Sequence, residues 1–232
     1  MILAGGRGTR LRPYTVVLPK PLMPIGDYPV LEVIIRQLAE HGFSQVTMAV
    51  NHQANLIQAF FRDGSQWGIN IDYSLESEPL STIGPVALIQ DLPDNFLLMN
   101  GDVLTDLDFR TFLDHHINNQ QLFTVSAARR IETIDYGVLH VNALGHLERF
   151  QEKPTTEHLV SMGVYGVSRR LFDRVPVGRK YGFDDLMYDL IEAGSTVNVE
   201  VHDGYWLDIG RPDDYARAIE EFERCPERFI GA

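Results

Sequence analysis

The segment LAGGRGTRLRP at positions 3–13 concentrates residues that suit the binding of a polyphosphate. Its three glycines would let the backbone approach a ligand closely; they are Gly5, Gly6 and Gly8. Arg10 supplies a planar cation, and Lys20, within Pro19-Lys20-Pro21, supplies a compact one. Backbone N–H groups and such cations together commonly hold phosphate groups. The glycine cluster alone fits an ordinary turn equally well, but its combination with Arg10 and Lys20 predicts a triphosphate-binding loop.

Two aspartates far apart in the chain could hold a metal ion. Asp102 follows the apolar stretch FLLMN, and Asp208 lies in GYWLDIGRPDDY at 204–215. A few carboxylate oxygens, completed by water and phosphate, are the ligands that Mg²⁺ prefers. The residues alone also fit a turn aspartate at 102 and a helix-capping acid at 208. Only the fold could bring these two carboxylates together.

Other charged and polar groups have ordinary structural interpretations. Glu152-Lys153-Pro154 follows a predicted strand and fits a loop with exposed charges. In Asp106-Leu107-Asp108 the second aspartate is well placed to cap a helix that begins near Phe109. His115 and His116 are neighbours on the predicted helix, so they cannot both face one metal ion, and a zinc site is not expected.

Composition limits the classes of protein that this chain can belong to. Its 232 residues suffice for one large domain or two small ones with a proper core. The net charge of −12 argues against a nucleic-acid partner, which requires a basic face. No apolar run approaches the ~18 residues of a membrane span, and no signal-peptide pattern opens the chain. The single cysteine, Cys225, fits a reducing cytoplasm. We therefore expect a cytoplasmic globular protein without a membrane or nucleic-acid partner.

Apolar periodicity predicts an α/β fold for the first half of the chain. Strands are predicted at 45–50, 70–75 and 96–100, alternating with helices at 30–41, 53–63 and 83–91. Such alternation is typical of a mostly parallel sheet flanked by helices. In these sheets ligands bind at the carboxyl ends of the strands. The glycine loop and Asp102 should therefore lie at the same edge.

After about residue 130 the pattern changes to a small antiparallel β addition. The predicted strands there are 137–141, 147–151 and 158–167, and the predicted helices are 168–174, 183–193 and 212–224. We expect a single domain over 1–232, in which about 1–130 bind the nucleotide and about 131–232 bind the second substrate. No internal repeat is visible, so a β-helix domain is not expected.

Taken in order, these motifs resemble those of the sugar-1-phosphate nucleotidyltransferases over essentially the whole chain. The resemblance implies a Rossmann-like fold of the glycosyltransferase-A type and an Mg²⁺ ion held by Asp102 and Asp208. It implies catalytic roles for Arg10 and Lys20 at the phosphates. It further implies a nucleotide site formed by Leu3, Ala4, Gly5, Gly6, Gly8, Thr9, Arg10, Lys20, Glu76, Ser81, Asn100 and Gly101. The sugar phosphate would contact Tyr136, Gly137, Glu152, Lys153, Ser161 and Trp206.

The resemblance also implies the reaction, in which an NTP and a sugar 1-phosphate give an NDP-sugar and pyrophosphate. The chain looks most like the branch of mannose- or heptose-1-phosphate guanylyltransferases, which use GTP. Glucose-1-phosphate thymidylyl- or uridylyltransferase stays an alternative, because Ser81 and Ile83 replace the usual glycine and alanine of the base-recognition loop at 76–85. A glycosyltransferase and a non-catalytic nucleotide-sugar sensor are alternatives from other classes. Because the family often forms dimers or tetramers, a homo-oligomer is also expected.

Overall fold

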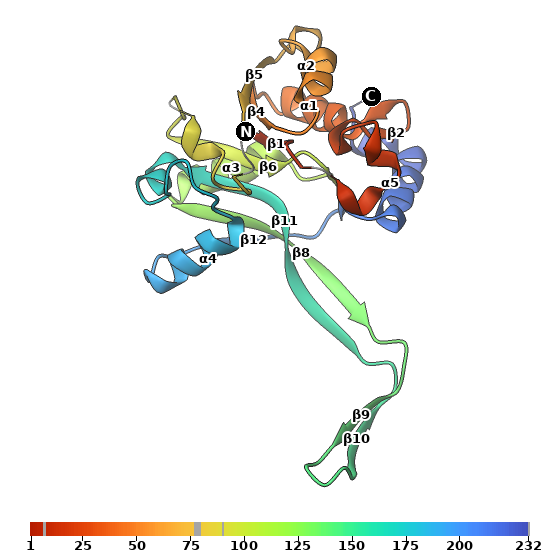
Figure 1. Ribbon diagram of the computed structural model, residues 1–232. Coiled ribbons are helices and arrows are strands. Elements are labelled where there is room, and N and C mark those ends of the chain that lie inside the picture. Colours follow the sequence, from red (N-terminus) through yellow and green to blue (C-terminus); the bar gives the residue numbers. More distant parts are fainter. Residues whose placement is uncertain (7, 77–79, 90, 232) are drawn as a thin grey trace.

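A seven-stranded sheet forms the centre of the computed structural model, which describes residues 1–6, 8–76, 80–89 and 91–231 (Figure 1). In spatial order its strands are β12 (Asn198–His202), β8 (Phe123–Thr133), β11 (Thr155–Ser168), β6 (Asn95–Asn100), β1 (Ile2–Leu3), β4 (Gln45–Val50) and β5 (Asn70–Leu75). Among the described strands of this sheet, only the two pairings made by β11 with β6 and β8 are antiparallel. The prediction of a mostly parallel sheet is thus confirmed.

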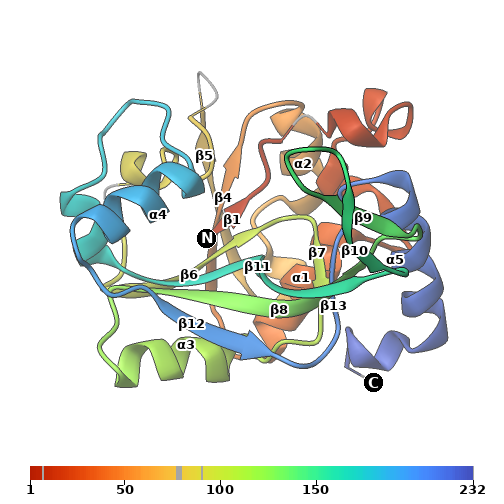
Figure 2. The same cartoon turned by 90° about the horizontal axis from the view of Figure 1, so that it is seen from below.

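The described part of the chain contains five α-helices, which lie around the sheet (Figure 2). They are α1 (Val30–Glu40), α2 (Ala54–Phe61), α3 (Phe109–Asn118), α4 (Phe183–Glu192) and α5 (Pro212–Arg224). Helix α1 begins after Pro29 and ends before Gly42. The φ of Gly42 is +78°, which lies in the left-handed region, so the right-handed helix cannot continue through it. The helix that the sequence predicted at 30–41 is thus confirmed to within one residue.

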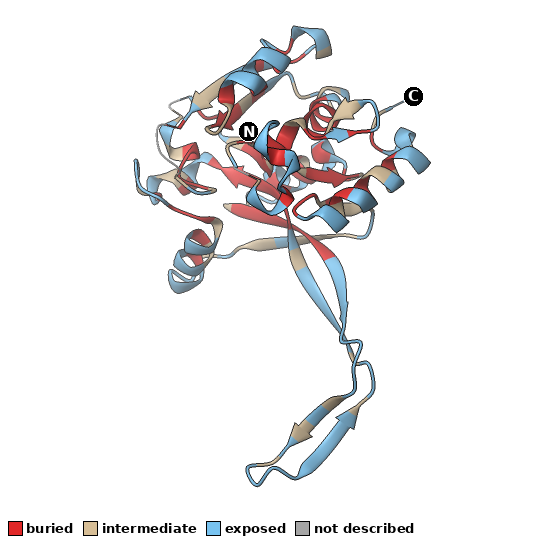
Figure 3. Ribbon diagram, turned by 45° about the vertical axis from the view of Figure 1, so that its right-hand side comes forward, coloured by how far each residue is buried: buried red, intermediate tan, exposed pale blue. Residues whose placement is uncertain are grey.

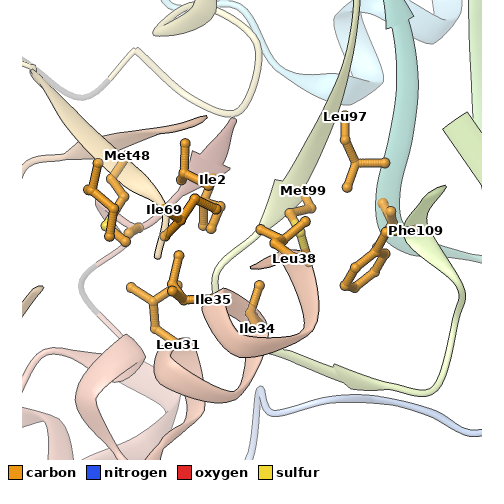
Figure 4. Packing of buried hydrophobic residues seen from close by; sticks show 14 of the residues in the cluster. Ile2, Leu31, Ile34, Ile35, Leu38, Met48, Ile69, Leu97, Met99 and Phe109 are labelled. Carbon is orange, nitrogen blue, oxygen red and sulfur yellow. The ribbon is translucent and has the colours of Figure 1, made fainter. Parts of the chain in front are cut away.

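The core divides between the two faces of the sheet, because successive side chains of a strand point to opposite sides. Leu97 and Met99 of β6 pack with α1, α2 and α3, where Ile35 and Leu38 of α1 approach Ile2 and Met99 (Figure 4). Phe96 and Leu98 of β6 point to the other face, where they pack with α4 and with the end of β8 that lies in the body. Both faces are therefore covered, as a parallel sheet requires.

A pair of short strands attaches the C-terminal segment to the edge of the sheet where β6 ends. β7 (Val103–Thr105) pairs antiparallel with β13 (Trp206–Asp208), and Asp208 lies opposite Val103. Leu104 and Leu207 are buried with α5 in a third apolar cluster. Another short pair, β2 (Pro24–Ile25) with β3 (Tyr28–Pro29), leads into α1. In the described part of the chain, no helix combines the length and apolar character needed to cross a bilayer.

The outer halves of β8 and β11 leave the body as a two-stranded arm (Figure 1). The arm, residues 129–160, ends in the hairpin of β9 (Val138–Val141) and β10 (Leu147–Gln151). All of its residues are described, and none is buried (Figure 3). The small antiparallel addition expected after residue 130 therefore exists, but it extends away from the sheet.

Two predicted helices are wrong. Residues 83–91, of which residue 90 lies outside the described part, hold only a 3₁₀ turn at Val86–Leu88. Its start is tied to another segment instead, because the N–H groups of Ile83 and Gly84 both donate to the carbonyl of Tyr181. Residues 168–174 form a 3₁₀ helix at Arg169–Asp173 rather than an α-helix. Strands β8 and β12 were not predicted.

Candidate active site

A cleft of ≈ 310 Å³ opens at the carboxyl ends of β1, β4 and β6. Its walls are Leu3, Ala4, Gly5, Gly6, Lys20, Pro21, Asn51, Glu76, Ser81, Thr82, Asn100, Gly101 and Asp102. The glycine loop and Asp102 thus meet at the edge of the sheet where the sequence predicted them, because three neighbouring parallel strands end there. Of the predicted nucleotide residues, Gly8, Thr9 and Arg10 do not line the cleft.

The glycine loop is shaped by close backbone packing at two of its positions. A side chain on Gly5 would come within 3.2 Å of the Glu76 carboxylate. Gly8 has a φ of +58°, and its carbonyl accepts a hydrogen bond of 2.7 Å from the Thr15 hydroxyl. In contrast, a Cβ built on Gly6 would meet no atom of the described, non-adjacent residues within 4 Å. Gly8 therefore sets the turn, whereas Gly6 leaves open space beside the cleft.

Lys20, Asp102 and Asp208 form a single charged cluster at the cleft. The Lys20 ammonium contacts Asp102 Oδ2 and lies 3.8 Å from Asp208 Oδ1. Lys20 stands at the start of a 3₁₀ turn, where the N–H of Leu22 donates to the carbonyl of Pro19. Asp208 is brought there by the β7–β13 pairing and by the Ile209 N–H, which donates to the carbonyl of Asp102 at 3.1 Å. The fold thus joins the two predicted carboxylates.

In this cluster, the pKa of the Asp208 carboxyl is raised above its ordinary value. Burial raises the pKa of its carboxyl, and the charge of Asp102 raises this pKa further, whereas Lys20 and Arg10 lower it. Arg10 is an exposed neighbour, and a side chain on Gly210 would lie 3.2 Å from its guanidinium and 2.9 Å from the Asp208 carboxylate. A cation bound in addition to Lys20 would reduce the repulsion between the Asp102 and Asp208 carboxylates.

The carboxylates of Asp102 and Asp208 fit a divalent cation whose coordination shell is completed by phosphate oxygens. Two carboxylates, one from the turn between β6 and β7 and one from β13, face the Lys20 ammonium, and a small number of hard oxygen ligands is what Mg²⁺ takes at phosphate-binding sites. Among the described residues, no three Asp, Glu, His or Cys side chains gather into a metal-binding group. Asp102 and Asp208 would therefore need ligands from a bound substrate and from water.

The far wall of the cleft carries polar groups that could recognise a base. Glu76 is buried, its pKa is raised by that burial, and its carboxylate accepts a bond of 3.2 Å from the Leu80 N–H. Asn51 donates to the carbonyl of Glu76 at 3.0 Å. Ser81 lines the same wall with a φ of +69°. Residues 77–79 of the predicted base-recognition loop lie outside the described residues.

Two of the predicted sugar-phosphate residues lie where the arm joins the body. Ser161 donates to the Tyr165 hydroxyl at 3.2 Å, and Trp206 donates to the carbonyl of Met162 at 2.9 Å. Between them Gly163, with a φ of +75°, packs against the Asn100 side chain, which leaves no room for a Cβ. This bulge in β11 therefore adjoins the cleft through Asn100.

The other four predicted sugar-phosphate residues lie at the far end of the arm. Tyr136 and Gly137 precede β9, and Glu152 and Lys153 follow β10, so all four flank the terminal hairpin (Figure 1). Gly137 packs against the ring of Phe150, and Tyr136 is 79% exposed. The structure brings these four residues together with one another but not with the cleft of their own chain.

The remaining charged motifs have structural roles. The carboxylate of Asp108 accepts a bond of 2.9 Å from the Thr111 N–H, which confirms it as the cap of α3. Asp106 binds His202 at 2.8 Å and Arg228 at 3.0 Å. Asn51 lines the cleft and was not predicted from the sequence, whereas Pro21 and Thr82, which also line it, lie inside predicted motifs but were not named as contact residues. Asn51 follows a predicted strand directly, and this position could have indicated it.

The chain belongs to the nucleotidyl transferase family, whose profile matches residues 1–224. It is 34% identical to a UTP–glucose-1-phosphate uridylyltransferase of Synechocystis, over 94% of this chain and 62% of the relative. It is 30% identical to a mannose-1-phosphate guanylyltransferase of Mycobacterium tuberculosis, over 97% of this chain and 64% of that protein. The chain therefore spans less than two thirds of the length of these curated relatives.

A solved structure shares the fold over nearly the whole length of both chains. The crystal structure of HddC from Yersinia pseudotuberculosis complexed with GMP-PN aligns with a TM-score of 0.72 at 25% identity. The alignment covers 95% of this chain and 97% of that one. The α/β fold class and the family resemblance drawn from the sequence are thus confirmed.

Proposed function

We propose that the protein transfers a nucleotidyl group from an NTP to a sugar 1-phosphate, which yields an NDP-sugar and pyrophosphate. The observation that carries this proposal is the cluster of Lys20, Asp102 and Asp208 at the mouth of a cleft walled by the glycine loop. Membership of the nucleotidyl transferase family and relatives that are named as sugar-1-phosphate nucleotidyltransferases support it.

The reaction needs positioned charges rather than a protein nucleophile. An oxygen of the sugar phosphate attacks the α-phosphorus, a new P–O bond forms, and the bond to the β-phosphate breaks as pyrophosphate leaves with the electron pair. The attacking oxygen is already ionised at neutral pH, so no general base is required. Catalysis then consists of alignment and neutralisation of charge. In this scheme Lys20 contacts the α-phosphate, Arg10 neutralises the leaving pyrophosphate, and the glycine loop cradles the triphosphate.

We assign Asp102 and Asp208 as the residues that hold a divalent ion, with Mg²⁺ as the expected metal. Their convergence on one ammonium supports this role, because the same oxygens can face a metal ion instead. Bound there, the ion would neutralise phosphate charge in both substrates. The remaining ligands would be phosphate oxygens and water.

The nucleotide that we propose is GTP, with mannose 1-phosphate or a related sugar phosphate as the acceptor. The Mycobacterium relative is named for this pair, and the Yersinia structure is described as holding GMP-PN. The Synechocystis relative, named for UTP and glucose 1-phosphate, keeps uridylyl and thymidylyl transfer as the second candidate. We place the residues that would discriminate between bases, Glu76 and Ser81, on the same wall of the cleft.

The test is pyrophosphate release with Mg²⁺, measured with five nucleoside triphosphates against mannose, glucose and heptose 1-phosphates. We expect release from GTP with one of these sugars, and a signal with UTP or dTTP would move the assignment to the second candidate. Nucleotide binding measured in parallel separates the failures. Binding without turnover across the panel would favour a nucleotide-sugar sensor, and the absence of binding would refute the function of the glycine loop.

A further inference from the structure

The hairpin at the tip of the arm has one apolar face that nothing in its own chain covers. In the β9–β10 register Leu139 lies opposite Phe150, and Val141 lies opposite Leu147. Opposite residues of a strand pair share a face, and so do residues two positions apart. These four side chains therefore form one apolar patch, the tip patch, and each of them is between 54% and 62% exposed.

The other face of the same hairpin is polar and internally bonded. His140 bonds Gln151 at 2.9 Å, and Arg149 lies 3.0 Å from the His140 ring. Apart from Val138, which lies opposite Gln151, the apolar side chains of the two strands are thus gathered on the first face, although the fold of the chain buries neither face. An isolated two-stranded ribbon is marginally stable in water, and a contiguous apolar patch usually marks an interaction surface. The tip patch therefore has the character of an interaction surface.

The path of the arm keeps the tip patch away from the cleft of its own chain. Between the body and the tip, β8 and β11 pair residue by residue from Ala127 with Ser161 to Thr133 with Thr155. The β-bulge of this ladder lies at the body end, between Ser161 and Tyr165. Arg129 and Glu157 add a cross-strand ion pair of 2.8 Å. The arm is a continuous ribbon that projects from the body in two views (Figures 1 and 3).

A second group of exposed apolar residues lies in the segment that leads to Lys20 at the cleft. Tyr14, Val16, Val17 and Leu18 connect the glycine loop to Lys20 and are 56%, 61%, 73% and 40% exposed. We call these four residues the loop patch. It is held in place by Gln53, whose amide donates to the carbonyls of Val16 and Val17 at 3.4 and 3.2 Å. A body placed on the loop patch would sit next to the catalytic cluster.

We propose that the tip patch of one protomer docks on the loop patch of a second copy, so that Glu152 and Lys153 complete the active site in trans. The role of those two residues at the sugar phosphate is the one that the family resemblance implies, and the inference rests on the proposed function for that role. The arm carries four of the six predicted sugar-phosphate residues but extends away from the cleft of its own chain, and exposed apolar residues adjoin that cleft. Reciprocal exchange between two copies satisfies both surfaces at once and closes the assembly as a symmetric dimer.

Solution mass tests the docking without any assay of activity. The wild-type chain should have twice the 26.3 kDa of one chain by light scattering. The double variant Leu139→Glu, Leu147→Glu charges the tip patch and should be monomeric. Ile191→Glu on α4, where the side chain is 70% exposed, is the matched control and should leave the dimer intact. A monomeric wild type, or a dimer that survives the tip variant, overturns the proposal.

Complementation tests whether the arm acts in trans. Lys20→Ala disables a cleft and Lys153→Ala disables an arm, and the two variants are co-expressed with different tags so that mixed dimers can be purified through both. If the arm acts in trans, each mixed dimer holds one intact site and should show about half of the wild-type activity. If it acts in cis, every site is damaged and the mixed dimer is as inactive as its parents, which overturns the proposal.

The same data separate this inference from the proposed function. If wild-type dimers that depend on the tip patch release no pyrophosphate with any pair of substrates, the function fails whereas the docking stands. If Lys153→Ala alone keeps wild-type activity, the role of the arm in the site is refuted.

Discussion

Lys20 and Asp102, 82 positions apart in the chain, form an ion pair at the mouth of the cleft. The same ammonium lies 3.8 Å from Asp208. Three segments thereby meet at one point: the turn after the glycine loop, the end of β6 and the β13 strand. Lys20 therefore attracts two carboxylates in the free protein, and it also stands where a phosphate would enter. When a polyphosphate and a divalent ion bind, the ion can pair with the two carboxylates and the phosphate can pair with the Lys20 ammonium.

Lys20→Ala should keep the fold and lose turnover by about 10²–10³, the loss typical of one preorganised electrostatic contact. The side chain lies at the cleft rather than in an apolar cluster, so the core stays intact. Lys180→Ala, at an exposed position, is the control and should be as active as the wild type. The comparison is made by the rate of pyrophosphate release and by circular dichroism. Near-normal turnover in Lys20→Ala would remove this residue from the catalytic machinery.

Asp208→Asn should lose turnover while it raises the free energy of unfolding at neutral pH. Burial and Asp102 raise the pKa of the Asp208 carboxyl, so the folded state binds its proton more tightly than the unfolded state does. Stability is therefore lost as the pH rises through the raised pKa, and the ionised carboxylate opposes folding at pH 7. Asparagine removes that charge, whereas Lys20 keeps its partner Asp102.

Urea denaturation at pH 7 checks this prediction, with Asp27→Asn at an exposed position as the control. A variant less stable than the wild type would mean that attraction to Lys20 and Arg10 outweighs the burial of the charge.

The sequence predicted the centre of the site because its parts follow strand ends. Regular apolar periods located β4, β5 and β6, and the parallel order then placed the glycine loop and Asp102 at one edge. It could not show that Asp208 joins them, because that contact depends on three residue pairs between β7 and β13. Local patterns carry no information about such distant pairing.

The direction of the arm could not be predicted from the sequence for a different reason. The strands at 137–141 and 147–151 were predicted within two residues of their observed bounds. Their direction relative to the sheet depends on how far the β8–β11 ladder continues past the body, and β8 was not predicted. The tip patch also alternates like a strand that packs on a core. Only the three-dimensional path reveals that no core of its own chain lies there.

Gly8 and Gly6 should respond in opposite ways to substitution by alanine. Gly8→Ala places a Cβ 2.9 Å from the Thr15 methyl at a φ of +58°, so it should lower stability by about 1 kcal/mol or more. Among the residues that the structure describes, none comes within 4 Å of a Cβ on Gly6 apart from its chain neighbours, so Gly6→Ala should leave the thermal midpoint unchanged. It should nevertheless weaken nucleotide binding, because the methyl group occupies space beside the cleft. Thermal melts with and without GTP and Mg²⁺ distinguish the two, and equal destabilisation by both variants would contradict the assigned turn.

His116→Gln should flatten the loss of stability on acidification. The imidazole is buried on α3, its Nδ1 lies 2.9 Å from the Thr124 hydroxyl, and its Nε2 has no partner among the described residues. Burial, with a smaller effect of Arg170, lowers its pKa from 6.5 to about 4. The unfolded chain therefore binds a proton between those two values that the folded chain does not, and stability falls as the pH falls through this window. The full effect is on the order of 3 kcal/mol. Glutamine can keep a hydrogen bond to Thr124 but does not titrate. Urea denaturation at pH 7 and at pH 5 should show a smaller difference for His116→Gln than for the wild type, and equal differences would exclude His116 as the titrating group.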